Sequence, residues 1–289
     1  MLLNHKIVLG SVQFGLPYGI NNIQGQTSKE EAFRILDRAL LNGIKTIDTA
    51  PAYGSAMELL AEYCQSNQKV EIYSKFHGHS EEEILHSIEK QLKLLKRESI
   101  KLLSYHNFND WNNYPLSLKV LQKLKSENVI NKIGISLYTI EEFERAIEAD
   151  VFDVIQIPYN LLDNYSIKGE MILKAKTKEL EIHTRSAFLQ GLFFKEIEKL
   201  SSYFYSLKPS LIKVKEMCAD NDVSITDLAL QYCVRNASID KVLIGVETEA
   251  QLIDNISALS SKVPEEMFRE INKIKLEAVN LLNPVNWPK

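Results

Sequence analysis

The sequence is poor in cysteine, has no run of basic residues and contains no long apolar segment free of polar side chains. Its three cysteines, Cys64, Cys218 and Cys233, are odd in number and widely spaced. They fit neither a disulfide framework nor a CxxC metal site, and they predict a reducing compartment. A net charge of −4 gives no electrostatic support to nucleic-acid binding. An ordinary apolar content of 45% excludes a disordered chain.

No segment has the character of a leader or of a membrane span. Residues 1–6 lack the apolar stretch and the small-residue cleavage site of a signal peptide. Residues 7–28 carry no charge, but four glycines, a proline and several Asn, Gln, Ser and Thr side chains would make them costly in lipid. We expect a strand followed by a loop there, and a cytoplasmic protein without a membrane partner.

Eight short β-rich segments recur along the chain, separated by stretches with helical periodicity. The segments are residues 6–10, 44–48, 71–75, 101–105, 132–136, 152–157, 181–185 and 241–245. This alternation, without a Pro-rich or Ser-rich linker, indicates parallel strands joined by crossovers. Eight such units in 289 residues predict an α/β fold, a closed (β/α)8 TIM barrel, as a single domain over residues 1–289.

An open doubly wound sheet is the alternative fold. Such a sheet usually carries a glycine-rich dinucleotide turn after its first strand, and residues 10–15 match neither GxGxxG nor GxxxxGK[ST]. The longest interval between predicted strands, residues 186–240, leaves room for an active-site loop and an extra helix.

Three helices are predicted to begin at a Ser or Thr followed three residues later by Glu, the pattern of a capping box. The pairs are Ser28 with Glu31, Ser80 with Glu83, and Thr139 with Glu142. Gly43 is expected to end the first of these helices, because glycine accepts the left-handed conformation that follows a helix.

Three consecutive predicted strands deliver reactive side chains to one rim of the barrel. Asp48 ends the second strand, Tyr53 follows in the next loop, Lys75 ends the third strand and His106 follows the fourth. Barrel enzymes carry their chemistry at the C-terminal ends of strands. A lysine ammonium favours the phenolate and lowers a tyrosine pKa, a carboxylate holds the lysine, and an imidazole can orient a substrate oxygen. This set predicts carbonyl reduction, with Tyr53 protonating the oxygen and a cofactor supplying hydride.

Each of these residues alone has an ordinary structural explanation. Asp48 could satisfy loop amides, Tyr53 could pack on the rim, Lys75 could be a solvated strand end, and His106 could be a structural histidine. Four such residues at three successive strand ends favour the catalytic interpretation.

At these residues the sequence resembles the aldo-keto reductase superfamily. Residues 43–54 resemble the family signature after strand two, residues 72–75 the strand-three lysine motif, and residues 103–106 the strand-four histidine motif. The resemblance continues through residues 134–136, 152–160, 185–191 and 243–245. It implies a catalytic tetrad of Asp48, Tyr53, Lys75 and His106, with Tyr53 as general acid and base in the interconversion of a carbonyl and an alcohol.

The resemblance also implies an extended nicotinamide cofactor across the barrel mouth. Ser136 and Gln156 would bind its carboxamide, and Ser186 with the turn at Gln190 and Gly191 would lie near its diphosphate. Two positions depart from the family pattern. Leu137 replaces the asparagine that usually follows the strand-five serine, and Arg185 replaces the aromatic residue that usually stacks on the nicotinamide. A guanidinium plane can also stack on a ring, but it adds a positive charge.

The segment after the eighth strand bears on the choice between the two nicotinamide cofactors. Most of the family takes NADPH and holds its 2′-phosphate with basic residues there. The candidate contacts in this chain are Gly245, Glu247, Gln251 and Asn255, and no Lys or Arg lies among residues 245–255. A carboxylate repels a phosphate and can accept a hydrogen bond from a free ribose hydroxyl. We therefore expect NADH to serve at least as well as NADPH. In the alternative, Glu247 points into solvent and a distant basic residue holds the phosphate.

The substrate is only weakly encoded. Residues 10–19 resemble a bacterial subgroup associated with sugar metabolism, which favours a sugar or a sugar-derived carbonyl. Five aromatic residues are candidates for the lining of the mouth, although we expect only some of them to serve there. They are Phe14, Tyr18, Phe108, Trp111 and Trp287.

A metal site is an alternative within catalysis. The candidate ligands are His77, His79, Glu81, Glu82, Glu83 and His86. The acidic run is better explained as the solvated first turn of a helix, where carboxylates suit the helix dipole. Metal ligands would also have to converge from several strands. We therefore expect no metal.

An alternative of another class is a cofactor-binding sensor or regulatory subunit, with the same barrel and little turnover. The complete set of four residues argues against it, because a binding module needs no paired Tyr53 and Lys75. The sequence leaves the physiological substrate, the preferred direction and the oligomeric state open.

Overall fold

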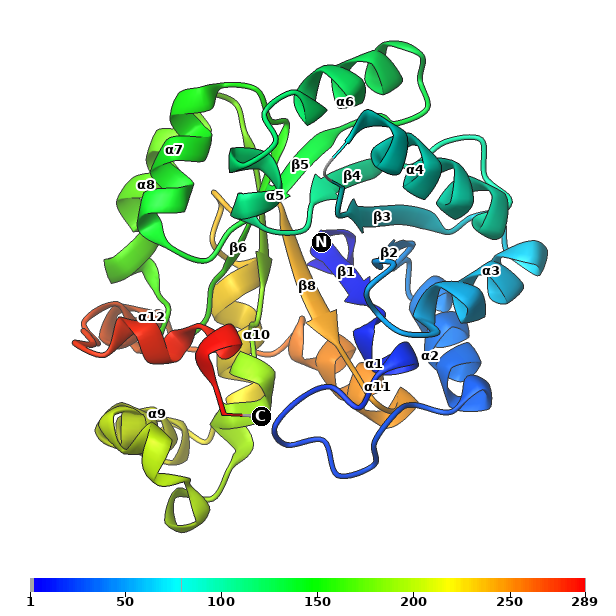
Figure 1. Cartoon of the computed structure of the whole chain (residues 1–289). Coiled ribbons are helices and arrows are strands. Elements are labelled where there is room, and N and C mark those ends of the chain that lie inside the picture. Colours follow the sequence, from blue (N-terminus) through cyan, green and yellow to red (C-terminus); the bar gives the residue numbers. More distant parts are fainter. Residues whose placement is uncertain (1–2, 79, 289) are drawn as a thin grey trace.

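The computed structural model describes residues 3–78 and 80–288. Eight parallel strands close into a barrel in the order β1 to β8, with β8 paired to β1 (Figure 1). The strands are β1 (Ile7–Gly10), β2 (Thr46–Asp48), β3 (Glu71–Phe76), β4 (Leu102–Tyr105), β5 (Ile133–Ser136), β6 (Val154–Pro158), β7 (Glu181–Arg185) and β8 (Lys241–Gly245). Each predicted segment contains one strand, with ends that differ by at most two residues. The predicted (β/α)8 barrel is confirmed.

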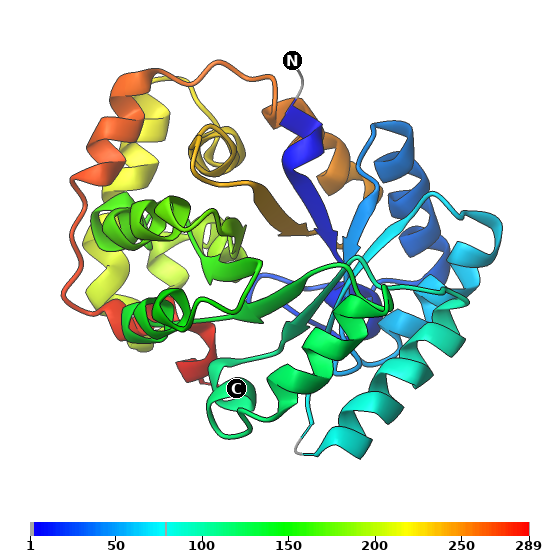
Figure 2. The ribbon, with the colours of Figure 1, turned by 90° about the horizontal axis from the view of Figure 1, so that it is seen from above.

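Helices surround the barrel, as the view from above shows (Figure 2). Those that follow the strands are α2 (Lys29–Leu41), α3 (Ala56–Ser66), α4 (Glu81–Leu95), α6 (Ser117–Ser126), α7 (Ile140–Ala149), α8 (Tyr165–Thr177), α10 (Ile225–Val234) and α11 (Glu249–Ala258). Shorter or additional helices are α1 (Val12–Gly15), α5 (Phe108–Asn112), α9 (Lys208–Asp220) and α12 (Glu265–Asn272). Because the strands are covered by helices outside and by side chains inside, they are buried on both faces.

An apolar layer fills the barrel beneath its mouth. Val8, Tyr73, Leu102, Val154 and Leu243 form a cluster separate from the core between strands and helices. Side chains two apart in a strand point the same way. The residues two positions further along each strand therefore also point inward, one layer nearer the mouth and above this apolar layer; they are Gly10, Lys75, Ser104, Gln156 and Gly245.

Of two predicted capping boxes, one is complete and the other is only half formed. Thr139 and Glu142 form a complete box at the start of α7. Ser28 accepts a hydrogen bond from the Glu31 N–H at 3.2 Å, as predicted, but the Glu31 carboxylate accepts from the Glu249 N–H at 2.6 Å instead of returning to Ser28. The Glu31 carboxylate, which would complete the Ser28 capping box, thus links α2 to α11 instead.

The remaining helix boundaries agree with the sequence. Ser80 caps α4 by accepting from the Glu83 N–H at 3.2 Å, and Gly43 has a φ of +78° just after α2. The long interval between β7 and β8 contains the 3₁₀ helices η2 (Leu189–Phe194), η3 (Ile197–Lys199) and η4 (Ser202–Leu207), followed by α9 and α10. Within the described residues, no helix has both the length and the apolar character to cross a membrane.

Candidate active site

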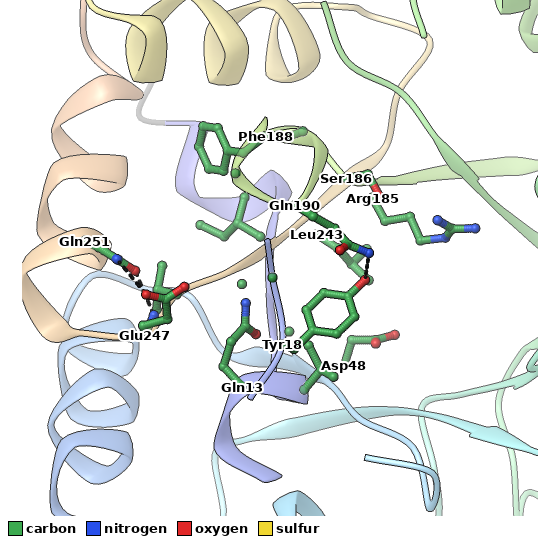
Figure 3. A pocket seen from close by; sticks show the side chains of 18 of the residues that line it. Gln13, Tyr18, Asp48, Arg185, Ser186, Phe188, Gln190, Leu243, Glu247 and Gln251 are labelled. Atoms are coloured by element: carbon green, nitrogen blue, oxygen red, sulfur yellow. Dashed lines mark hydrogen bonds between the residues drawn. The ribbon is translucent and has the colours of Figure 1, made fainter. Parts of the chain in front are cut away.

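A pocket of about 590 Å³ lies at the C-terminal rim of the barrel (Figure 3). All four predicted catalytic residues line it, together with all ten predicted cofactor residues. These are Asp48, Tyr53, Lys75, His106, Ser136, Gln156, Arg185, Ser186, Gln190, Gly191, Gly245, Glu247, Gln251 and Asn255. The fold brings residues from seven strand ends into one cavity, which is where barrel enzymes carry their chemistry.

A buried ion pair forms the base of the catalytic group. The Lys75 ammonium lies 2.5 Å from Asp48 Oδ1, and the two side chains are 3% and 6% exposed. The same ammonium donates a hydrogen bond to Tyr53 Oη at 3.2 Å. β2 and β3 are adjacent strands, so their inward-facing ends place the carboxylate beside the ammonium. The pair fixes one cation next to the phenol.

The pKa of Tyr53 differs from the sequence-based expectation. Burial raises the pKa of the Tyr53 hydroxyl, and this effect outweighs the lowering by Lys75, while Asp48 adds to the increase. Burial lowers the pKa of Lys75, but Asp48 and Tyr53 together raise it above its ordinary value. Lys75 acts on Tyr53 in the predicted direction, and the phenol nonetheless stays protonated at neutral pH. Tyr53 is thus a proton donor in the resting site.

His106 stands beside Tyr53 as a neutral imidazole. Its ring is perpendicular to the Tyr53 ring, with centroids 5.9 Å apart. Burial, with the positive charge of Lys75 and then His77, lowers the pKa of His106 to about 3. Nδ1 is buried without a hydrogen-bond partner in the described part of the chain. A neutral imidazole carries one N–H donor and one acceptor, so it can bind a substrate oxygen without a net charge.

His77 supports His106 from outside the pocket. The two imidazoles are stacked, with centroids 4.4 Å apart and planes 16° apart. His77 Nδ1 lies 2.9 Å from Asp110 Oδ2, and Asp110 belongs to the capping box of α5. The sequence interpretation missed this contact, although both histidines directly follow neighbouring strands. His79 lies outside the described residues. Within residues 3–78 and 80–288, no group of three or more His, Cys, Asp or Glu side chains could hold a metal ion.

Ser136 ends β5 and pairs in register with Gln156, the middle residue of the neighbouring strand β6. The Gln156 amide donates to Asp48 Oδ2 at 3.5 Å, while its Oε1 is buried with no hydrogen-bond partner among the described residues. A buried acceptor without a donor is costly unless a ligand supplies one. The amide group of a nicotinamide carries such a donor, so this position fits the cofactor.

A turn after β7 and the loop after β1 meet over the pocket. Gln190 Nε2 donates to Tyr18 Oη at 2.7 Å, drawn as a dashed line in Figure 3, and the Ile20 N–H donates to the Gln190 carbonyl at 3.2 Å. Gly191 has a φ of +87°, and a Cβ there would lie 2.7 Å from the Asn21 side chain. Glycine is therefore required at the closest approach of the two segments.

The predicted aromatic lining is largely wrong. Of the five candidates only Tyr18 lines the pocket, whereas Phe14, Phe108 and Trp287 are buried in the core. Trp111 packs against the Phe108 ring, with centroids 5.5 Å apart. The aromatic residues that line the pocket besides Tyr18 and Tyr53 are Tyr138, Phe188 and Phe194.

The end of the pocket after β8 is acidic. The Glu247 N–H donates to Gln251 Oε1 at 2.7 Å, and Gln251 Nε2 donates to the Glu247 carboxylate at 3.4 Å. Glu247 and Asp254 both line the pocket, and the basic residues of the described lining are Lys75 and Arg185. Lys75 belongs to the catalytic ion pair, so no lysine or arginine from the β8–α11 segment faces this end.

Comparisons with known proteins agree with this site. Residues 6–276 match the model of the Aldo/keto reductase family. The chain is 24% identical to a D-threo-aldose 1-dehydrogenase of a Pseudomonas species, covering 90% of this chain and 94% of that one. It is 25% identical to the L-galactose dehydrogenase of Arabidopsis thaliana, covering 99% and 95%.

A solved aldo-keto reductase of Bacillus halodurans has the same fold, with a TM-score of 0.76 and 21% identity over 93% of this chain and 91% of that one. The match of the family model covers nearly the whole chain. The chain belongs to the aldo/keto reductase family and is an NAD(P)-dependent oxidoreductase that interconverts carbonyl and alcohol groups.

Proposed function

We propose that the enzyme is an NAD(H)-dependent oxidoreductase of sugars, with Tyr53 as its general acid and base. The observation that carries the proton-transfer role is the position of the Lys75 ammonium, which contacts both Asp48 and the Tyr53 hydroxyl. This contact gives the phenol a fixed cation that favours its deprotonated form at the moment of proton transfer.

In the reductive direction, Tyr53 and the neutral His106 donate hydrogen bonds to the substrate carbonyl oxygen. A nicotinamide cofactor held by Ser136 and Gln156 would supply the hydride that the carbonyl carbon accepts. Tyr53 then passes its proton to the developing alkoxide, and Lys75 stabilises the phenolate that remains. Asp48 keeps Lys75 charged and in place. In the oxidative direction the same phenolate accepts the proton of the alcohol.

The cofactor residues follow from the same pocket. We assign Ser136 and Gln156 to the carboxamide, because the Gln156 Oε1 lacks a donor among the described residues. We assign the turn at Ser186, Gln190 and Gly191 to the diphosphate, because all three residues line the pocket. Gly245, Glu247, Gln251 and Asn255 then lie at the adenosine end.

NADH is favoured over NADPH by the charge of that end. Glu247 and Asp254 line it, and a 2′-phosphate placed there would meet carboxylates without a basic partner from the β8–α11 segment. A ribose with free hydroxyls would instead offer donors to the Glu247 carboxylate.

Sugars are favoured as substrates by two of the relatives. The Pseudomonas relative is a D-threo-aldose 1-dehydrogenase and the Arabidopsis relative is an L-galactose dehydrogenase. The pocket also has tyrosine hydroxyls on its catalytic side that could bind sugar hydroxyl groups, those of Tyr18 and Tyr138. We propose a cytoplasmic enzyme, because its three cysteines are free and buried.

Steady-state assays with a panel of sugars test this proposal. We expect NAD+ to be reduced with free aldoses, or NADH to be oxidised with sugar-derived aldehydes and ketones, in preference to simple aldehydes of similar reactivity. Tight binding of NADH without turnover of any carbonyl would contradict it, and would indicate a cofactor-binding regulatory protein instead.

A further inference from the structure

Arg185 is a cation without a counter-ion in the pocket. It ends β7 and lines the cavity, yet none of the ion pairs among the described residues includes it. Its Nη2 donates to the Leu137 carbonyl at 3.0 Å, and its guanidinium lies 4.1 Å from the centre of the Tyr138 ring. These two contacts hold the plane of the group in place without neutralising it.

The guanidinium is directed away from the adenosine end of the pocket. Leu137 and Tyr138 follow β5, which lies opposite β1 in a closed barrel of eight strands in sequential order. Glu247 and Gln251 follow β8, next to β1. Figure 3 shows these two residues on one side of the pocket and Arg185 on the other. The charge therefore lies in the half of the mouth away from the adenosine end, where the nicotinamide and the substrate are proposed to meet.

The same half contains the groups that transfer protons. Arg185 lowers the pKa of both Tyr53 and His106, as a nearby positive charge does, although burial and other neighbours have larger effects. The charges of Asp48 and Lys75 compensate each other in their ion pair. The catalytic half of the pocket thus has one uncompensated positive charge, which a bound anion would neutralise.

The chemistry of the anion follows from the donor. A guanidinium has five N–H groups in a planar fork, and the described contacts of Arg185 include one hydrogen bond. The free edge of this fork matches a carboxylate, which accepts two parallel hydrogen bonds. One positive charge also balances a carboxylate monoanion, whereas the dianion of a phosphate ester would keep a negative charge.

We infer that Arg185 is a specificity residue that binds a carboxylate on the substrate, and that the preferred substrates are sugar acids such as uronates. The inference rests on the proposed function, since it names the class of sugar that this site turns over. The carbonyl or hemiacetal of the sugar would meet Tyr53 and His106 while its carboxylate meets Arg185.

Matched pairs of sugars test this inference, because they differ in a single group. D-glucuronate differs from D-glucose, and D-galacturonate from D-galactose, in having a carboxylate at C6. We expect kcat/KM to be at least tenfold higher for each uronate, mainly through a lower KM. Arg185→Gln should make kcat/KM equal for the uronate and the neutral sugar. Arg185→Lys should keep part of the preference for the uronate, because lysine retains the charge but not the planar fork.

Arg145→Gln is the matched control. The Arg145 guanidinium also covers an aromatic ring, that of Phe108 at 4.8 Å, and donates to Asn112, but it does not line the pocket. This variant should leave the uronate preference unchanged. Equal kcat/KM for uronates and neutral sugars would overturn the inference, as would a preference for the 6-phosphates of the same sugars.

A binding measurement separates this inference from the proposed function. If no sugar is turned over, the proposed function fails, and calorimetric titration of D-glucuronate into the enzyme saturated with NADH then decides on Arg185. Binding that is lost in Arg185→Gln supports the inference, and absence of binding overturns it. If Arg185→Gln weakens NADH binding and leaves the uronate preference intact, Arg185 serves the nicotinamide cofactor and the inference is wrong.

Discussion

Replacement of Lys75 by methionine should affect stability and catalysis by separate routes. The Lys75 and Asp48 side chains are 3% and 6% exposed, and the ammonium is the cation that compensates the Asp48 carboxylate. In Lys75→Met, the hydrogen bond that remains to this carboxylate among the described side chains is that of the Gln156 amide, at 3.5 Å. Breaking a buried pair by removing one partner leaves an uncompensated charge, so we expect the free energy of unfolding to fall by about 3–5 kcal/mol.

The catalytic effect of the same substitution has a different origin. Lys75 lowers the pKa of Tyr53 against the effect of burial, and it stabilises the phenolate through the 3.2 Å hydrogen bond. Without the ammonium the pKa of Tyr53 should rise further, so proton transfer becomes slower. We expect kcat to fall by about 10²–10⁴, the range typical of general acid–base catalysis.

A double variant separates the two effects. In Asp48→Asn with Lys75→Met no buried charge is left unpaired, so urea unfolding should show most of the stability restored while kcat remains low. The reasoning would be refuted if Lys75→Met unfolded with less than about 1 kcal/mol of destabilisation, the level of an exposed ion pair. It would also be refuted if the double variant were no more stable than the single one.

Three further changes test the remaining assignments. Tyr53→Phe should lower kcat by about 10²–10⁴ and leave NADH affinity, measured by fluorescence, nearly unchanged; more than about a tenth of the activity would contradict a general acid. His106→Ala should lower kcat/KM but leave the pH profile between pH 5 and 8 unaltered. The reason is that the pKa of His106 is about 3, so the ring is neutral throughout this range. Loss of an ionisation between pH 5 and 8 in the variant would show that His106 titrates there. Glu247→Arg should shift the ratio of kcat/KM toward NADPH, and a wild-type preference for NADPH of tenfold, about 1.4 kcal/mol, would overturn the NADH assignment.

The positions of the catalytic residues could be predicted because they depend on local order along the chain. Alternating strands and helices make the strands parallel, so the C-terminal ends of all of them lie at one rim. Asp48, Lys75 and His106 had to converge there once the barrel was recognised. The pKa of Tyr53 could not be predicted in the same way. Its direction depends on how much surrounding protein excludes water, and neighbours in sequence do not determine this.

Contacts between segments far apart in the chain could not be predicted from the sequence either. Tyr18 and Gln190 are 172 residues apart, and Arg185 at the end of β7 contacts Tyr138, which follows β5, past the intervening strand β6. Glu31 stands three residues after Ser28, the position of a capping-box glutamate. Because α11 lies close by, the Glu31 carboxylate instead accepts a hydrogen bond from the Glu249 N–H. In each case the partner is chosen by the three-dimensional path of loops, whose local sequence allows several arrangements.

The hydrogen bond between Tyr18 and Gln190 has a kinetic consequence. β8 lies between β1 and β7 in the barrel, so a bond from the loop after β1 to the turn after β7 passes over the end of β8, where the cofactor is proposed to lie. We therefore expect this bond to open each time an extended dinucleotide enters or leaves. The enzyme should therefore follow an ordered sequence in which the dinucleotide binds first and departs last, with its departure limiting turnover.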